Sequence, residues 1–337
     1  MPNSESNFLR TILLLSVCFA FSGSTSSMTV SASSLIGYGL ADNKALATLP
    51  ISFHLLGTML AGIPASLLMK RVGRRYGFMI GTGIGVSGAA AATLAIIYSN
   101  FIFFCLSIFL LGLLSGFSQL YRFAAAEVAS TELRAKAVSW VMLGGIIAGF
   151  IGPTIAVKAK DLIADAPFAG SYLVVIILHV VIVAILFMIR LPQPTVEEQT
   201  GESRPWREIF SQPKFIVAVL TSMIGYGVMA MIMTATPLAM TLGSGHHFSD
   251  AAFVIQWHVV GMFAPSFFTG SLIHRFGAVP VIISGILLNL LCIGINFAGT
   301  DVLNYWVALI LLGMGWNFMF VAGTTMVTET YRPAEKA

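Results

Sequence analysis

Runs of about 20 apolar residues recur along almost the whole chain, and this repetition limits the possible folds more than any other feature. Hydrophobic residues make up 57% of the 337 residues, whereas charged residues make up only 9%. Soluble proteins use about 25% charged residues, so this chain has too few to face water on every side. Because a helix of about 20 apolar residues crosses the hydrocarbon layer of a bilayer, the composition indicates a protein embedded in lipid.

Lipid requires each span to satisfy its own backbone hydrogen bonds, so the apolar runs should be helices. The period-two alternation typical of outer-membrane barrels is absent from the sequence. We therefore predict an all-α polytopic membrane protein with ten spans. They cover residues 10–37, 45–69, 77–97, 101–123, 135–157, 169–190, 214–240, 250–273, 279–298 and 302–325.

The positive charges fall on one side of this arrangement. Fourteen of the 18 Lys and Arg residues lie at the N-terminus or in the connections that follow the even-numbered spans. Lys44, Lys158 and Lys160 fall on the other side, and Arg122 lies near the end of the fourth span. Because Lys and Arg mark the cytoplasmic side, we expect both termini to be cytoplasmic, in a bacterial cytoplasmic (inner) membrane.

A polar, proline-containing stretch separates six spans from four. Residues 191–213, "LPQPTVEEQTGESRPWREIFSQP", have the composition of a linker. We predict an N-terminal six-helix bundle at 1–190, a cytoplasmic linker at 191–213, and a C-terminal bundle at 214–337 that holds four of six helices.

The two halves repeat each other without a gap. "FHLLGTMLAGIPASLLMKRVG" at 53–73 matches "WHVVGMFAPSFFTGSLIHRFG" at 257–277, so that His54 and His258 are 258 − 54 = 204 residues apart. A looser match aligns Gly116 in the fourth span with Gly315 in the tenth. Parallel repeats of this kind occur in secondary transporters.

The repeat also predicts a longer parent protein. After Ala137 the first copy continues through two more spans to Arg190, which is 190 − 137 = 53 residues, whereas the second copy ends at the matching place. We expect a parent with 12 spans, of which this chain carries ten.

The basic turn after the second span resembles the signature of the major facilitator superfamily, roughly Gly-x-x-x-Asp-Arg-x-Gly-Arg-Arg. "SLLMKRVGRR" matches it at Arg71, Gly73, Arg74 and Arg75, and "GSLIHRFGAV" matches it at Gly270, Arg275 and Gly277. The resemblance covers essentially the whole chain. The acid of the signature is replaced by Lys70 in the first copy and by His274 in the second, and its first glycine is replaced by Ser66.

The resemblance implies a transporter whose cytoplasmic gate is locked at this turn. Glycine lets two helix ends approach closely, and arginine binds carboxylates and the carbonyl ends of helices. The expected gate residues are Lys70, Arg71, Gly73, Arg74, Arg75, Glu127, Arg275 and Gly277. Glu127 or Glu132 would supply the missing negative charge, and the alternative is that the cluster only anchors the chain's topology.

His54 and His258 are the leading candidates for the solute or proton pathway. Each lies about 16 residues, or roughly 24 Å of helix, before the end of the basic motif, and so within the membrane. Ionisable groups there usually face a cavity, and histidine exchanges protons near neutral pH. The alternative is that each imidazole binds a neighbouring backbone carbonyl and only packs.

The stretch "QLYRFAAAE" supplies further candidates, Gln119, Tyr121 and Arg122. Arg122 either reaches into a cavity to hold a polar or anionic group, joins the cytoplasmic lock, or extends to the interface. The hydroxyl-rich first span, "SGSTSSMTVSASS", either lines an aqueous cavity or packs closely against other helices.

Other classes of function lack their motifs in this sequence. The three cysteines, Cys18, Cys105 and Cys292, lie far apart in apolar runs, so we predict no disulfide framework and no metal site. "GIGVSG" lies in the middle of an apolar run without a preceding strand, so it predicts no dinucleotide cofactor. No basic stripe suggests nucleic acid, and no catalytic motif suggests an enzyme.

We therefore expect a secondary active transporter, or permease, that moves a small solute by alternating access, with proton coupling left open. Its partners would be the solute, the lipid bilayer and, if coupling holds, protons. The alternative is a non-transporting membrane sensor or binding protein, or an inactive truncated product.

Overall fold

The computed structural model describes residues 2–129, 134–189, 191, 204–328 and 330, and every regular element in these ranges is helical. Ten segments of the described chain are helical, long and apolar enough to cross a membrane. This confirms the predicted all-α membrane fold with ten spans. By contacts the chain divides into two compact units, which are described separately.

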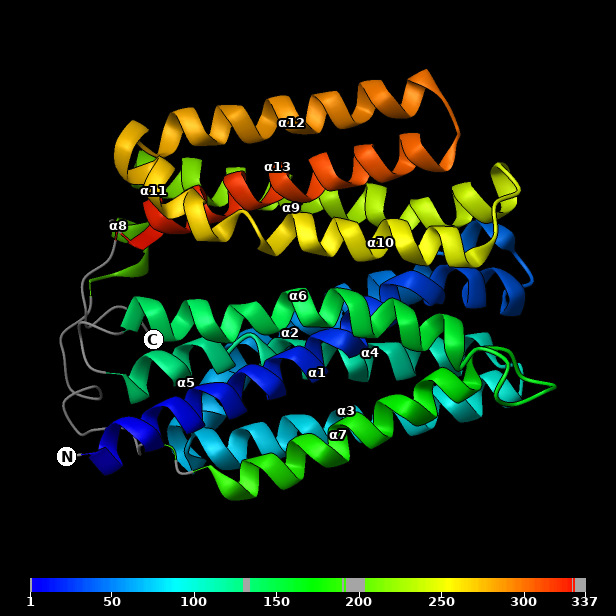
Figure 1. Cartoon of the computed structure of the whole chain (residues 1–337), viewed down its shortest axis with the longest axis horizontal. Helices are drawn as coiled ribbons and strands as arrows, with labels where there is room; N and C mark the ends of the chain where they lie inside the picture. Colours follow the sequence, from blue (N-terminus) through cyan, green and yellow to red (C-terminus); the bar gives the residue numbers. More distant parts are fainter. Residues whose placement is uncertain (1, 130–133, 190, 192–203, 329, 331–337) are drawn as a thin grey trace. The chain divides into compact units, whose positions relative to one another are not determined.

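Unit 1 comprises residues 1–193 and 234–256. Its long helices run side by side in Figure 1, with the short α5 at one end. Its elements are α1 (Pro2–Leu40), the 3-10 turn η1 (Lys44–Leu46), α2 (Leu49–Val72), α3 (Arg74–Ile97), α4 (Phe101–Ser118), α5 (Tyr121–Val128), α6 (Arg134–Lys158) and α7 (Ala169–Met188).

Unit 2 comprises residues 194–233 and 257–337. Its elements are α8 (Trp206–Phe210), α9 (Pro213–Leu238), α10 (Phe248–Phe263), α11 (Ser266–Phe276), α12 (Ala278–Ala298) and α13 (Val302–Thr328). The end of α9, the π-helical turn η3 (Ala239–Gly243) and the start of α10 belong to unit 1 by their contacts. The units therefore differ from the predicted division at 190 and 214, which follows the linker and stays a prediction.

Small residues allow α1 and α6 to pack closely in unit 1. A Cβ added to Gly144 would collide with the backbone oxygen of Ser16, and one added to Gly152 would collide with that of Ser24. Ala148 lies against Gly23 in the same interface. Such contacts suit a membrane protein, because helices in lipid associate through close packing rather than through the hydrophobic effect.

The internal repeat is visible in how the helices touch. Gly112 of α4 lies against the backbone of His54 in α2, and Gly313 of α13 lies against the backbone of His258 in α10. The second interface thus follows the first with an offset of 313 − 112 = 201 residues. The looser match of Gly116 with Gly315 was therefore wrong by two residues, because Gly116 packs on Ala61 of α2 whereas Gly315 packs on α12.

One span of unit 2 is broken where its counterpart in unit 1 is continuous. Helices α10 and α11 are separated by a turn at Ala264 and Pro265, whereas α2 continues through the equivalent positions. Asn317 of α13 stabilises the break by donating to the carbonyl of Met262 and to the hydroxyl of Ser266, each at 2.7 Å, and Thr269 donates back to its Oδ1. From the sequence alone, residues 250–273 were expected to form one continuous span.

Candidate gate and solute pathway

Gly73 forms the sharp connection between α2 and α3. Its φ of 84° lies in the left-handed region that favours glycine, and its amide caps α2 by donating to the carbonyl of Met69 at 2.9 Å. The turn places Arg74 at the first position of α3. The conformation of this one residue thus allows α3 to begin at Arg74, whose side chain reaches Glu127 of α5.

Arg74 and Glu127 form a two-point ion pair between α3 and α5. Nε of Arg74 donates to Oε2 of Glu127 at 3.1 Å, and Nη2 donates to Oε1 at 2.5 Å. The two side chains are 18% and 38% exposed, so water reaches the pair only in part. The structure therefore gives Glu127 the contact expected of the counter-charge, while Glu132 lies outside the described residues.

The other basic residues of the motif make different contacts. Arg75 donates to the carbonyl of Phe187, in the last turn of α7, at 3.1 Å and lies over the Phe187 ring at 5.4 Å. This is the favourable arrangement of a cation at a helix C-terminus. Lys70 and Arg71 are exposed on the last turn of α2 and form no ion pair with a described residue.

The second copy repeats the turn but not the ion pair. Gly277 joins α11 to α12 with a φ of 85°, nearly the value at Gly73. Arg275 is exposed and lies over the ring of Phe276 at 5.2 Å. Ala278 stands where the first copy has Arg74. Within the described residues, the paired lock therefore belongs to unit 1.

His54 lies at the crossing of α2 and α4 and is 5% exposed. Its Nε2 lies 3.3 Å from the hydroxyl of Ser115, which lies 2.7 Å from the hydroxyl of Ser26 on α1. Its Nδ1 is buried and has no hydrogen-bond partner among the described residues. A chain of three polar side chains from three helices thus connects the half-buried Ser26 to a buried imidazole.

His258 has the equivalent place in unit 2 but different partners. It is fully buried, and its Nδ1 donates to the carbonyl of Leu309 on α13 at 2.8 Å. Its Nε2 has no partner among the described residues. This contact fits the packing alternative, because the imidazole closes a helix–helix interface and touches no hydroxyl chain.

Arg122 and Gln119 lie at the junction between α4 and α5. Gln119 is exposed and ends α4, and Arg122 lies in the first turn of α5 with its guanidinium over the ring of Phe123 at 5.1 Å. Nε of Arg122 is buried and makes no hydrogen bond, and no described carboxylate pairs with this residue. The structure leaves donor capacity on Arg122 that a solute can use.

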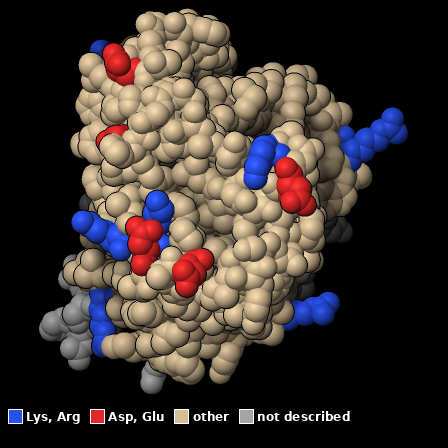
Figure 2. Space-filling view, turned by 90° about the vertical axis from the view of Figure 1, so that its right-hand side faces the viewer, with Lys and Arg blue, Asp and Glu red and all other residues tan. Residues whose placement is uncertain are grey.

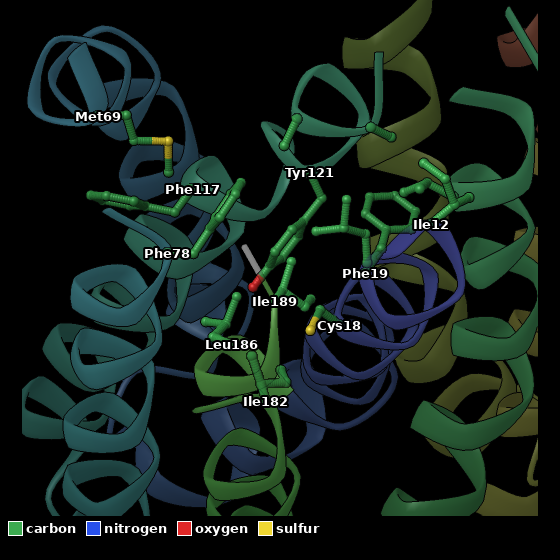
Figure 3. Packing of buried hydrophobic residues seen from close by; sticks show 14 of the residues in the cluster. Ile12, Cys18, Phe19, Met69, Phe78, Phe117, Tyr121, Ile182, Leu186 and Ile189 are labelled. Atoms are coloured by element: carbon green, nitrogen blue, oxygen red, sulfur yellow. The ribbon is translucent and has the colours of Figure 1, made fainter. Parts of the chain in front are cut away.

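Tyr121 occupies the packed interior of unit 1 rather than an accessible surface. It is 2% exposed, and its ring stacks on Phe78 with centroids 4.0 Å apart. Figure 3 shows its hydroxyl among buried side chains of the unit 1 core, which include Leu186 and Ile189. This position favours a packing role for Tyr121 over contact with a solute.

Sequence reasoning missed Ser26 and Ser115 as single residues. The signal was present as the hydroxyl-rich first span, which left cavity lining and packing open. In the structure, Ser24 and Ser31 bond to carbonyls of their own helix, whereas Ser26 reaches across to Ser115 of α4.

Solved transporters share this fold. The chain superposes on a D-xylose–proton symporter with a TM-score of 0.69 at 14% identity, covering 95% of this chain and 85% of that one. It superposes on the nucleoside transporter NupG with a TM-score of 0.68 at 13% identity, covering 97% and 84%. At these identities the similarity concerns the fold alone.

Sequence comparisons identify relatives with higher identity than these solved structures. The chain is 40% identical over 331 residues to the riboflavin transporter RfnT of Brucella anthropi, covering 97% of this chain and 82% of that protein. It is 28% identical over 349 residues to YdeG of Bacillus subtilis, an uncharacterized MFS-type transporter, covering 99% and 81%. The profile of the Major Facilitator Superfamily matches residues 13–337. The chain therefore belongs to the Major Facilitator Superfamily, whose members are integral membrane transporters and not enzymes.

Proposed function

We propose that this protein moves riboflavin, or a flavin of closely similar shape, across the bacterial cytoplasmic membrane by alternating access. The observation that carries this proposal is the 40% identity to a riboflavin transporter over 97% of the chain. The match covers nearly the whole chain rather than a single motif or span. Riboflavin combines a flat heteroaromatic ring with a neutral polyhydroxylated chain, so its site needs stacking surfaces and hydrogen-bonding groups.

The proposed orientation follows from charge. The N-terminus and the connections that follow even-numbered spans carry 14 of the 18 Lys and Arg residues, and the rule of positive cytoplasmic loops predicts that they lie in the cytoplasm. Figure 2 views the opposite end of the helices, where positive and negative side chains are few and interspersed. Both termini would then be cytoplasmic.

Alternating access requires contacts on each side that can form and break. On the basic side, the Arg74–Glu127 pair ties α3 to α5. At the opposite end of unit 1, the hydroxyl of Ser34 donates to the carbonyl of Thr234 at 3.1 Å, and Gln256 donates to the hydroxyl of Thr154 at 3.1 Å. Single neutral hydrogen bonds of this kind contribute about 1 kcal/mol each, which a rearrangement can exchange.

His54 is the proposed proton-exchanging group, and Arg122 the proposed polar contact for the solute. The Ser26–Ser115–His54 chain supports proton exchange, because hydroxyls both donate and accept. Arg122 supports solute contact, because its guanidinium has no carboxylate partner in the described chain and flavin carbonyls accept hydrogen bonds. Gln119 is exposed on the same connection and could add an amide.

Uptake of labelled riboflavin tests the proposal. The full chain would be expressed in a bacterial strain that neither synthesises nor imports riboflavin, and purified for reconstitution into liposomes. We expect growth on micromolar riboflavin in the strain and saturable flux in the liposomes, with unlabelled riboflavin competing. Riboflavin binding without flux would instead support the sensor or binding-protein alternative, and neither binding nor flux would remove riboflavin as the solute.

A further inference from the structure

Three aromatic side chains gather inside unit 2, on α9 and α13. The rings of Trp316 and Phe320 stack with centroids 4.8 Å apart and an interplanar angle of 14°. Tyr226 meets Trp316 edge to face with centroids 6.1 Å apart. The helices approach closely beside them, because Gly225 packs directly against Met319. We name Tyr226, Trp316 and Phe320 the aromatic cluster.

The cluster holds a buried donor that nothing in the described chain satisfies. Trp316 is 7% exposed, and its indole N–H has no hydrogen-bond partner. The neighbouring Asn317 is almost completely buried, yet both ends of its amide are bonded. A buried N–H without an acceptor costs stability, and within a membrane water rarely supplies one. Such a donor is therefore explained best by a ligand that brings the acceptor.

The internal repeat shows which residue of unit 1 corresponds to Trp316. With the offset of 201 shown by the glycine contacts, Trp316 is the counterpart of Ser115, since 115 + 201 = 316. Ser115 is the residue that connects His54 to Ser26 in unit 1. The same place in the fold thus carries a polar relay in unit 1 and an aromatic ring in unit 2.

The cluster is also accessible at the appropriate depth. Tyr226 is 37% exposed and Phe320 is half-buried, so part of each of these two rings is left uncovered by the described chain. Tyr226 lies near the middle of the span Pro213–Gly243, and Trp316 near the middle of the span Val302–Val327. Solute sites of secondary transporters lie near the bilayer midplane.

We propose that Tyr226, Trp316 and Phe320 bind the flat heteroaromatic ring of the solute, with the Trp316 N–H donating to a carbonyl or imine acceptor on the ring edge. For riboflavin, that ring is the isoalloxazine system. The inference rests on the proposed function for the identity of the solute, and it names the residues that would recognise the ring rather than the hydroxylated chain.

Fluorescence titration of the purified full chain in detergent tests the inference, because stacking on tryptophan quenches flavin emission. The probes are riboflavin, lumiflavin as the ring without its hydroxylated chain, and ribitol as the chain without its ring. We expect wild-type protein to bind riboflavin and lumiflavin with affinities within about tenfold of each other, and ribitol not to compete.

Substitutions of Trp316 then distinguish the contribution of its ring surface from that of its indole N–H. Trp316→Phe keeps an aromatic surface but removes the N–H, and should weaken binding of both flavins about fivefold. Trp316→Ala removes the surface as well and should weaken binding more than about tenfold. Trp206→Phe is the matched control, because Trp206 is 69% exposed on α8, outside the spans. Thermal unfolding of each variant checks that it remains folded.

Three contrary outcomes would be distinguishable. If wild-type protein binds no flavin, the proposed solute is wrong and the cluster is not a flavin site. If wild-type protein binds both flavins but folded Trp316→Phe and Tyr226→Leu variants bind them unchanged, the solute stands and the aromatic cluster is excluded as its site. Weakened binding in Trp306→Phe alone would place the ring at the tryptophan pair Trp257 and Trp306, and would also overturn the inference.

Discussion

The carboxylate of Glu127 receives two parallel hydrogen bonds from the guanidinium of Arg74, so a single pair joins α3 to α5 at the basic end of unit 1. The pair is partly exposed, and we assign it about 1 kcal/mol after screening by water. An interaction of that size holds a conformation without making it permanent, which is the property a reversible gate needs.

Breaking this pair should open the basic side. In Glu127→Gln, the neutral amide keeps the shape but loses the charge, and a loss of about 1 kcal/mol shifts a two-state equilibrium about fivefold. Maleimide labelling of a cysteine introduced at Ser118, which is 6% exposed at the end of α4, should accelerate by that factor. Glu208→Gln on α8 is the control, because Glu208 is 58% exposed and pairs only with Arg204 at 3.6 Å among the described residues. Equal labelling rates in wild type and Glu127→Gln would argue for an anchoring role only.

The two histidines should behave differently although their sequence contexts match. His54→Gln and Ser115→Ala both interrupt the chain that reaches Ser26, so riboflavin uptake in either variant should lose its dependence on pH between about 5.5 and 8, a range around the ordinary histidine pKa near 6.5. His258→Gln should lower the yield of folded protein while keeping the wild-type pH profile, because His258 bonds to a backbone carbonyl. Uptake measured at fixed membrane potential checks this, and a flattened profile in His258→Gln would reverse the assignment.

The ten spans were predictable because lipid allows few backbone conformations, so hydropathy alone locates the helices. The offset of 204 residues between His54 and His258 was also predictable from the sequence. The glycines of the basic turns, Gly73 and Gly277, have the same spacing and align the two copies without a gap. Both glycines have positive φ in the structure, which gives the physical reason for their repetition.

Contacts between helices were not predictable in the same way. The glycine of the looser match, Gly315, faces α12 rather than the helix that carries His258, and one sequence does not show which face of a helix a glycine occupies. The difference between the histidines depends on Ser115, which lies 61 residues from His54 in the chain. The stacking of Tyr121 on Phe78 of α3 likewise joins two residues that lie 121 − 78 = 43 positions apart in the chain.

Two glycines at the helix crossings should be irreplaceable. Gly112→Ala and Gly313→Ala place a methyl group against the backbone of His54 and His258, respectively. Because the obstacle is backbone rather than a flexible side chain, the two helices would have to move apart. We expect each to destabilise its unit by about 1–3 kcal/mol. Gly83→Ala and Gly294→Ala are matched controls, since an added Cβ meets nothing within 4 Å at either position. Thermal unfolding in detergent measures all four, and equal midpoints for Gly112→Ala and Gly83→Ala would contradict the close crossing.

Asn317 should stabilise the break between α10 and α11. Its amide bonds to Met262, Ser266 and Thr269 from within a span, and Asn317→Leu leaves the carbonyl of Met262 and both hydroxyls without that partner. Because each unsatisfied buried group costs about 1–3 kcal/mol, the loss should exceed that of Asn296→Leu, since the Asn296 amide donates to Cys292 on its own helix. Amide hydrogen exchange near residues 262–269 should accelerate in Asn317→Leu and remain unchanged in Asn296→Leu. A variant that unfolds at the wild-type temperature with unchanged exchange would show that Pro265 alone maintains the break.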